Sequence, residues 1–150
     1  MTEHTESRDM LEEHKEIRRE LEELDNFLEK APAQPGRQKW LVDLRDRLGR
    51  LRPTIEGHFA REETVGFFEQ IEAAWPNAAP QCQQFREEHR RLVVRIDDVL
   101  SHSARKPLSD QPFLAVVTET KSITRDLRDH EGRETDLFNA AIEGGPAAQD

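Results

Sequence analysis

Four histidines and two glutamates recur at helical spacings within otherwise apolar rows of residues. Two of the histidines are each followed one helical turn later by a glutamate, in the runs His58-Phe-Ala-Arg-Glu62 and His130-Glu-Gly-Arg-Glu134. Residues four apart lie on one face of a helix, so each pair points at the same place. The other two histidines, His14 and His89, stand alone on their own segments. Neutral imidazole and carboxylate are good ligands for iron, manganese or zinc.

These six side chains occupy positions that face the core, where a polar group needs a partner. A buried carboxylate without a partner is destabilising by several kcal/mol, and a buried imidazole must also satisfy its nitrogens. One histidine on an apolar stripe is more often a hydrogen-bonded core residue than a ligand. Six such residues in register over four segments favour a shared pair of divalent metal ions instead. By contrast, Glu63, Glu88 and Glu131 flank the histidines off the core rows, and the pattern predicts surface charges there.

The segments that carry these residues are predicted helices separated by proline- and glycine-rich turns. Such clusters occur at 31–36, 75–80 and 105–112, and they end helices. The predicted helices span 9–30, 37–74, 81–104 and 112–143, with a tail at 144–150. Their core rows step by three and four and run from Met10 to Leu28, Leu41 to Val65, Phe85 to Val99 and Phe113 to Ala141. The fold class is therefore all-α, an up-down-up-down antiparallel four-helix bundle, in a single domain over 1–150.

The lengths of the segments place all four histidines at one height in such a bundle. His14 lies about 17 residues before the first turn and His58 about 22 after it, which at 1.5 Å per residue is roughly 25–33 Å in each case. His89 and His130 lie at comparable distances, about 16 and 18 residues, from the third turn. The four side chains can therefore meet, near the end that carries the 75–80 turn.

The composition of the chain limits which kinds of partner it can bind and indicates its cellular compartment. Apolar and charged residues each make up 35% of the 150 residues, a balance typical of amphipathic helices. The net charge of −9 argues against a nucleic-acid partner. No run of about 20 apolar residues predicts a membrane span, and no secretory signal is visible. The single cysteine, Cys82, cannot form an intramolecular disulfide, which predicts a cytoplasmic protein.

The pattern of ligands resembles that of the hemerythrin and HHE cation-binding family over almost the whole chain. That family has a histidine on the first helix, His-x-x-x-Glu on the second, a histidine on the third and His-x-x-x-Glu on the fourth. The resemblance implies a non-haem di-iron centre bridged by Glu62 and Glu134, with the histidines as terminal ligands. It thus implies two iron ions as cofactors, with manganese or zinc as alternatives.

Two positions depart from the oxygen-carrying members of the family. Those proteins have a second histidine on the third helix where this chain has Val93, and an aspartate on the fourth helix where it has Glu134. The resulting set of four histidines and two glutamates is more similar to di-iron proteins of iron–sulfur cluster repair and of nitric oxide or peroxide handling. The loss of one histidine leaves an iron more open, which favours redox turnover over oxygen storage. The resemblance therefore implies a protein that binds dioxygen, nitric oxide or peroxide and reduces or detoxifies it as an oxidoreductase.

Three alternatives are distinguishable. A ferritin-like di-iron bundle uses Glu-x-x-His, but the residues three before the histidines are Leu11, Ile55, Arg86 and Leu127, which excludes it. A non-enzymatic carrier or sensor of oxygen or iron would use the same ligands without turnover. A structural protein would hold zinc there, or keep the site as a vestige. An oxidoreductase or a sensor also needs a redox or signalling partner protein, which the sequence leaves unidentified.

Overall fold

The structure is a computed structural model that describes residues 2–33, 35–64, 66–105 and 108–143, with side chains from residue 8 onward. Within these ranges the chain forms helices and no strands. The elements are α1 (Thr2–Glu29), α2 (Arg37–Thr64), α3 (Phe67–Ala74), a 3-10 turn η1 (Pro76–Ala78), α4 (Ala79–Ser103) and α5 (Asp110–Ile142).

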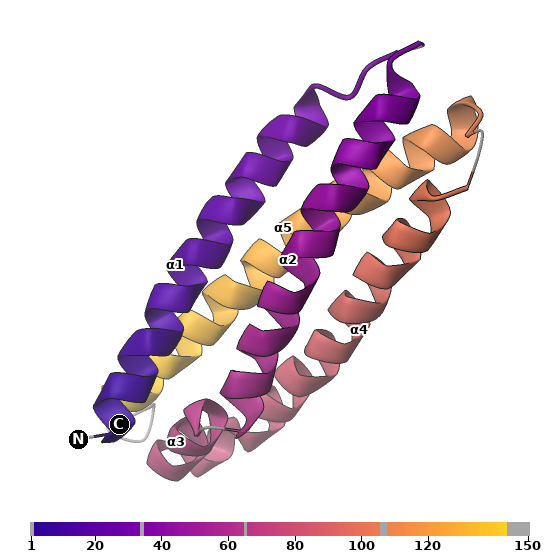
Figure 1. The fold of residues 1–150 in the computed structure, drawn as a ribbon. Helices are drawn as coiled ribbons and strands as arrows, with labels where there is room; N and C mark the ends of the chain where they lie inside the picture. The colour runs from indigo at the N-terminus through magenta and orange to yellow at the C-terminus, as the bar shows by residue number, and fades with distance from the viewer. Residues whose placement is uncertain (1, 34, 65, 106–107, 144–150) are drawn as a thin grey trace.

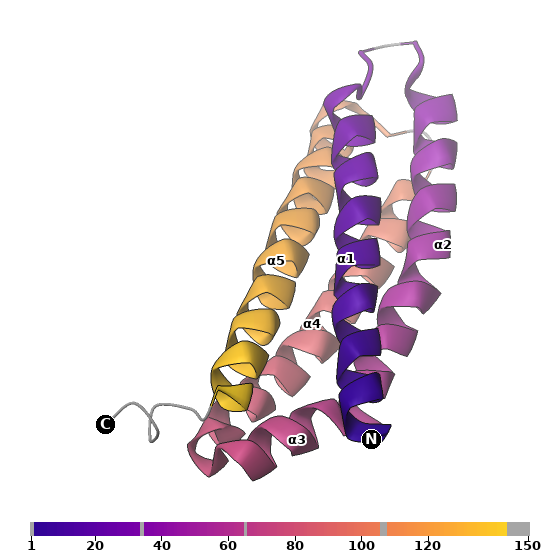
Figure 2. The same ribbon diagram turned by 90° about the vertical axis from the view of Figure 1, so that its left-hand side faces the viewer.

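The four long helices, α1, α2, α4 and α5, pack around one core and alternate in direction (Figure 1). Each long helix contacts its neighbour in the chain, and α5 closes the ring against α1. The view turned by 90° shows the same arrangement, with the short α3 lying across one end (Figure 2). The all-α bundle predicted from the sequence is confirmed.

The predicted core rows are also confirmed. Every described residue of the four rows is buried, including the histidines and glutamates. Two parts of the prediction, Val65 and the tail at 144–150, lie outside the described residues. Of the helices described, none is long and apolar enough to cross a membrane.

Three of the predicted helix starts were too late. α1 begins at Thr2 and not at residue 9, because the polar residues before Asp9 continue the helix without adding apolar residues that would reveal it. α4 begins at Ala79 and not at residue 81, and α5 at Asp110 and not at residue 112. Proline is tolerated in the first turn of a helix, where its missing N–H has no partner to lose. Both helices therefore start just before their proline and not after it.

The predicted continuous helix over 37–74 is wrong. α2 ends at Thr64, and Gly66 adopts a left-handed conformation with φ 102° and ψ 0°, a region that glycine enters without steric cost. The chain then turns and α3 crosses the end of the bundle, where it contacts all four long helices. The amphipathic pattern of α3 resembled a continuation of α2, so periodicity alone did not reveal the turn.

The core is divided into three layers along the bundle. A large apolar cluster fills the half nearer the 31–36 turn, with Leu21, Leu44 and Leu127 among its fully buried members. A smaller apolar cluster fills the end covered by α3 and includes Phe67, Phe68 and other side chains. The histidines and glutamates lie between the two clusters. On α1, for example, the order is Met10, His14 and Ile17, from the small cluster to the large one.

Candidate metal centre

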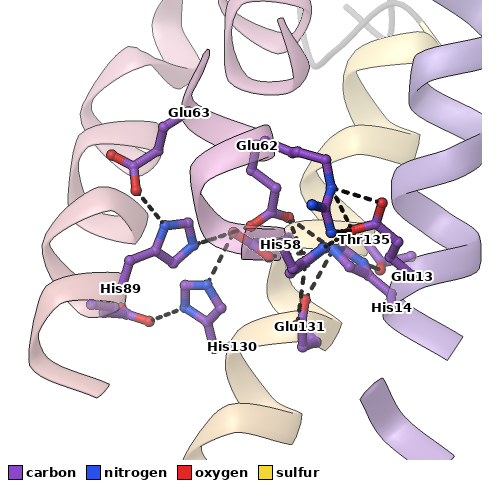
Figure 3. Close-up of polar contacts among 12 residues, drawn as sticks. Glu13, His14, His58, Glu62, Glu63, His89, His130, Glu131 and Thr135 are labelled. Atoms are coloured by element: carbon purple, nitrogen blue, oxygen red, sulfur yellow. Dashed lines mark hydrogen bonds and ion pairs between the residues drawn. The ribbon is translucent and has the colours of Figure 1, made fainter. Parts of the chain in front are cut away.

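Seven buried side chains bring their ligand atoms together in the polar layer (Figure 3). They form two groups, within each of which the ligand atoms lie within 4.8 Å of one another. One group contains His14, His58, Glu62, Glu131 and Glu134, and the other contains Glu62, His89, His130 and Glu134. Glu62 and Glu134 belong to both groups. This is the arrangement that two neighbouring metal ions with shared carboxylates require.

The first group is centred on the histidines of α1 and α2. His14 Nε2 lies 2.8 Å from Glu62 Oε2 and 2.9 Å from Glu131 Oε2. His58 Nε2 lies 3.3 Å from Glu62 Oε2 and 3.4 Å from Glu131 Oε1. Both Nε2 atoms thus face the same two carboxylates.

The second group is centred on the histidines of α4 and α5. His89 Nε2 lies 3.2 Å from Glu62 Oε1 and 3.1 Å from Glu134 Oε2. His130 Nε2 lies 3.0 Å from the same Glu134 oxygen. Glu62 therefore faces one group with each of its oxygens, as a bridging carboxylate does.

All four histidines are oriented by a contact at Nδ1, the ring nitrogen that does not face the shared carboxylates. Nδ1 of His58, His89 and His130 donates a hydrogen bond to a half-buried glutamate, and Nδ1 of His14 pairs with a threonine hydroxyl. The pairs are His14–Thr135 at 2.9 Å, His58–Glu13 at 2.9 Å, His89–Glu63 at 2.8 Å and His130–Glu88 at 2.7 Å. Such contacts turn Nε2 toward the interior and make imidazole a stronger ligand.

Two arginines hold two of these outer glutamates in place. Arg61 donates to both oxygens of Glu13, with a shortest distance of 2.7 Å, and Arg133 donates to both oxygens of Glu88, again from 2.7 Å. Burial raises the pKa of each carboxyl group, but the arginine and the adjacent histidine outweigh burial and lower it. Both glutamates are therefore anionic and able to accept the histidine proton.

The site repeats itself in the two halves of the chain. Glu13 before His14 reaches the histidine of α2, and Glu88 before His89 reaches the histidine of α5. The clamping arginine stands three residues after that histidine in both halves. The two halves differ directly after the glutamate of each His-x-x-x-Glu run, where Glu63 contacts His89 in one half and Thr135 contacts His14 in the other. They also differ directly after the histidine of each run.

That position is Phe59 in α2 and Glu131 in α5. The Phe59 ring stacks on the His89 ring with centroids 3.8 Å apart and planes 5° apart. Glu131, only 1% exposed, points instead toward His14 and His58. The first group therefore has a third carboxylate, and the second group has an aromatic ring in the corresponding place.

In the absence of metal, protons compensate the buried charges. Burial lowers the pKa of His14, but the carboxylates of Glu131 and Glu62 more than reverse this and raise it to about 9. The same balance raises the pKa of His58 to about 11, and Glu134 and Glu62 raise that of His89 to about 10. Burial and the charge of Glu62 raise the pKa of Glu134 to about 7. The cluster thus holds cations against carboxylates, and a bound metal would replace those protons.

The protein alone leaves several ligand atoms of the cluster without a hydrogen-bond partner. The buried orphans are Nε2 of His58 and His130, Oε1 of Glu62, both carboxylate oxygens of Glu131 and Oε1 of Glu134. Some lie close to an opposite charge, but none meets hydrogen-bond geometry. Buried polar atoms without partners are rare in proteins. Because these atoms converge from α2 and α5, next to His14 of α1 and His89 of α4, the donor set fits a pair of metal ions.

The structure brings together all six residues predicted as ligands, which lie at one height as the segment lengths indicated. The prediction that Glu63, Glu88 and Glu131 are surface charges is wrong: the first two hold histidines, and Glu131 lies inside the cluster. The sequence contained a signal for Glu131. Its counterpart in the other His-x-x-x-Glu run is Phe59, and an apolar residue at that position indicates that the position faces the core.

The fold and the cluster define a helical-bundle protein with a buried histidine–carboxylate site suited to a metal pair. Residues 5–142 match the family model described as Hemerythrin HHE cation binding domain, and the chain belongs to this hemerythrin family. The resemblance noted in the sequence is thereby confirmed. Comparisons with curated proteins and with solved structures gave no match.

Proposed function

We propose that this protein is a non-haem di-iron protein that binds dioxygen, nitric oxide or peroxide and reduces or detoxifies it. His14, His58 and Glu131 would hold one metal ion, and His89 and His130 the other. Glu62 and Glu134 would bridge them. The observation that carries the proposal is the pair of buried donor groups that share these two carboxylates.

Iron is compatible with the donor set, and it is the metal that the resemblance to hemerythrins implies. Imidazole and carboxylate suit iron, manganese and zinc, whereas a site for soft metals would contain thiolate. The only cysteine, Cys82, lies in the small apolar cluster, and burial raises the pKa of its thiol to about 12, so it remains protonated. A bound iron pair supplies one-electron chemistry and binding of small oxidants. Manganese or zinc in the same ligands remains the alternative that metal analysis distinguishes.

Turnover is favoured over storage by the charge of the site. Three carboxylates and four neutral imidazoles would surround the two ions, and anionic ligands stabilise the higher oxidation state of a metal centre. The outer carboxylates Glu13, Glu63 and Glu88 add negative charge through the histidines. Such a ligand set would oppose the spontaneous return to the reduced state that reversible oxygen carriage needs, whereas in turnover an external reductant would supply the electrons. A carrier or sensor with the same ligands is the competing function.

The residues around the cluster have separate roles in this proposal. Phe67 and Phe68 from α3 lie with ring centroids 6.0 Å from His14 and 5.7 Å from His89, and they exclude water from the end of the site. The arginine-clamped glutamates hold the histidine Nδ1 protons. The acidic chain is proposed to act in the cytoplasm, without nucleic acid or membrane, and to receive electrons from a partner protein.

The test is metal content per chain in protein produced with iron supplied, followed by the visible spectrum before and after peroxide or nitric oxide. About two irons per chain are expected, because the donors form two groups. Catalytic loss of peroxide or nitric oxide with a reductant present would establish turnover. A stable oxygen adduct that survives repeated cycles would instead establish a carrier. Zinc alone, or no metal, would overturn the di-iron proposal.

A further inference from the structure

The two proposed metal positions are not equivalent in the number of protein ligands they have. The position near His14 has two imidazoles and three carboxylates, and the position near His89 has two imidazoles and the two shared carboxylates. A small molecule can bind only where the protein leaves a coordination position open. The count of donors therefore favours the position held by His89 and His130.

The side chains around His89 leave that position without a further donor. Phe59, the counterpart of Glu131, offers a ring face and no lone pair. Val93 stands one turn after His89 on α4, on the same helix face, and it is also apolar. Neither residue can complete the coordination of a metal at this position.

A groove leads to the same side of the site. It has a volume of about 520 Å³ and lies between α2 and α4, with Phe59 and Ala60 on one wall and Val93 and Val94 on the other. His89 also lines it, and the same imidazole presents Nε2 to the bridging carboxylates. The stacked rings of Phe59 and His89 therefore separate the groove from the metal position, and a ligand entering from the groove would have to pass them.

The chemistry of the groove selects the kind of molecule that can use it. Its inner walls are apolar, and the carboxylates of Glu56 and Glu63 lie at its edge with one arginine, Arg90. Apolar walls with more acidic than basic groups disfavour small anions and admit uncharged molecules.

We infer that small uncharged ligands such as nitric oxide or dioxygen reach the metal pair through the groove between α2 and α4. They bind at the metal held by His89 and His130, while Glu131 closes the metal held by His14 and His58. This inference rests on the proposed di-iron centre, and it adds which metal binds the ligand and by which route.

The first experiment blocks the groove and measures nitric oxide binding to the reduced, iron-loaded protein by stopped-flow absorbance. Ala60→Trp fills the groove from an exposed helical position, and Ala115→Trp is the matched control, because Ala115 is an exposed helical alanine lining a separate pocket of about 490 Å³. We expect Ala60→Trp to slow association by roughly tenfold or more and the control to leave it unchanged. Equal rates in the two variants, both with two irons, would overturn the route.

The second experiment changes the open position itself. Val93→His supplies an imidazole one turn from His89, so nitric oxide binding should weaken by roughly tenfold or more while the iron content stays unchanged. Unchanged binding would assign the ligand to the other metal.

The third variant tests the closure by Glu131. Glu131→Ala should either take up additional nitric oxide per chain or lose the iron near His14 while the remaining iron still binds the probe. Loss of all nitric oxide binding with both irons retained would contradict the inference. Iron content is measured in every sample, so absence of iron from the wild-type protein would refute the di-iron proposal separately.

Discussion

The same row pattern runs through the large apolar cluster and through the polar layer beside it, but the residues that fill the rows differ in chemistry. In the half nearer the 31–36 turn, the rows carry mainly leucine, isoleucine and valine, which are buried without needing polar partners. In the polar layer, the rows instead carry His14, His58, His89, His130 and the two glutamates shared by both donor groups. The difference shows that one helical framework can contain a stabilising core and a functional site, provided that each occupies its own height.

The two regions also differ in what stabilises them. Burial of apolar surface stabilises the fold by about 25 cal/mol per Å² and needs no ligand. The polar layer gains little in this way, because its buried charges must be compensated by protons or by a bound metal. Its contribution to stability therefore depends on what is bound, whereas that of the apolar half does not.

The largest effect on metal binding is expected from Glu62→Ala, which removes a carboxylate shared by both donor groups. We expect both metal ions to bind more weakly and the metal content to fall below two per chain. The stabilisation that metal gives the native state, about 2.7 kcal/mol when metal is present at 100 times its dissociation constant, should then be lost. Metal analysis and thermal melting with and without iron measure this. Glu22→Ala, at an exposed position of α1, is the control, and an unchanged metal content in Glu62→Ala would contradict the assigned bridge.

Leu44→Ala should show the complementary behaviour in the apolar half. Leu44 is fully buried in the large cluster, and truncation of such a leucine lowers the free energy of unfolding by about 2–5 kcal/mol. The loss should be the same with and without metal, and the iron content should not change. Denaturant unfolding of both forms measures it. A fall in iron content would show that the two regions are coupled and that the comparison fails.

A smaller effect is expected from Glu88→Gln, which keeps the size of the side chain that accepts the His130 proton but removes its charge. Loss of an outer contact to a histidine ligand weakens metal binding by about 10–100-fold. Glu87→Gln changes the neighbouring exposed glutamate of α4 and should have no effect. Competition with a chelator measures the metal affinity of both variants. Equal affinities in the two variants would show that Glu88 does not support the metal ligand His130.

The sequence was sufficient to predict the bundle and the positions of the six main donor residues, because both follow from the same helical periodicity. A row that steps by three and four places apolar residues and ligands on the same inward face, so the core and the polar cluster were predicted together. This argument did not predict Glu131 as a buried residue, because Glu131 lies beside the row and not on it. The row describes the centre of the buried face, and a helix in a four-helix bundle buries a wider stripe than that row.

The turn at Gly66 and the outer contacts could not be predicted in the same way. The break depends on a single residue with positive φ between two amphipathic stretches, and periodicity is insensitive to one such residue. The contacts of Glu13 and Glu88 join neighbouring helices, so they depend on how the helices are rotated against each other. Sequence spacing within one helix carries no information about that rotation.

A pH dependence confined to the metal-free protein is also expected. The pKa values of His14, His58 and His89 are raised to about 9, 11 and 10 in the fold, above the value of about 6.5 for an unfolded chain. The stabilisation from these protonated histidines is complete below about pH 6.5 and is lost as the pH rises through the folded values. Metal-free protein should therefore melt at a lower temperature at pH 10 than at pH 7. The iron-loaded protein should not show this fall, because its imidazoles bind metal and not protons. A parallel fall in both forms would mean that the histidines do not bind the metal, and it would remove the distinction between the polar layer and the apolar half.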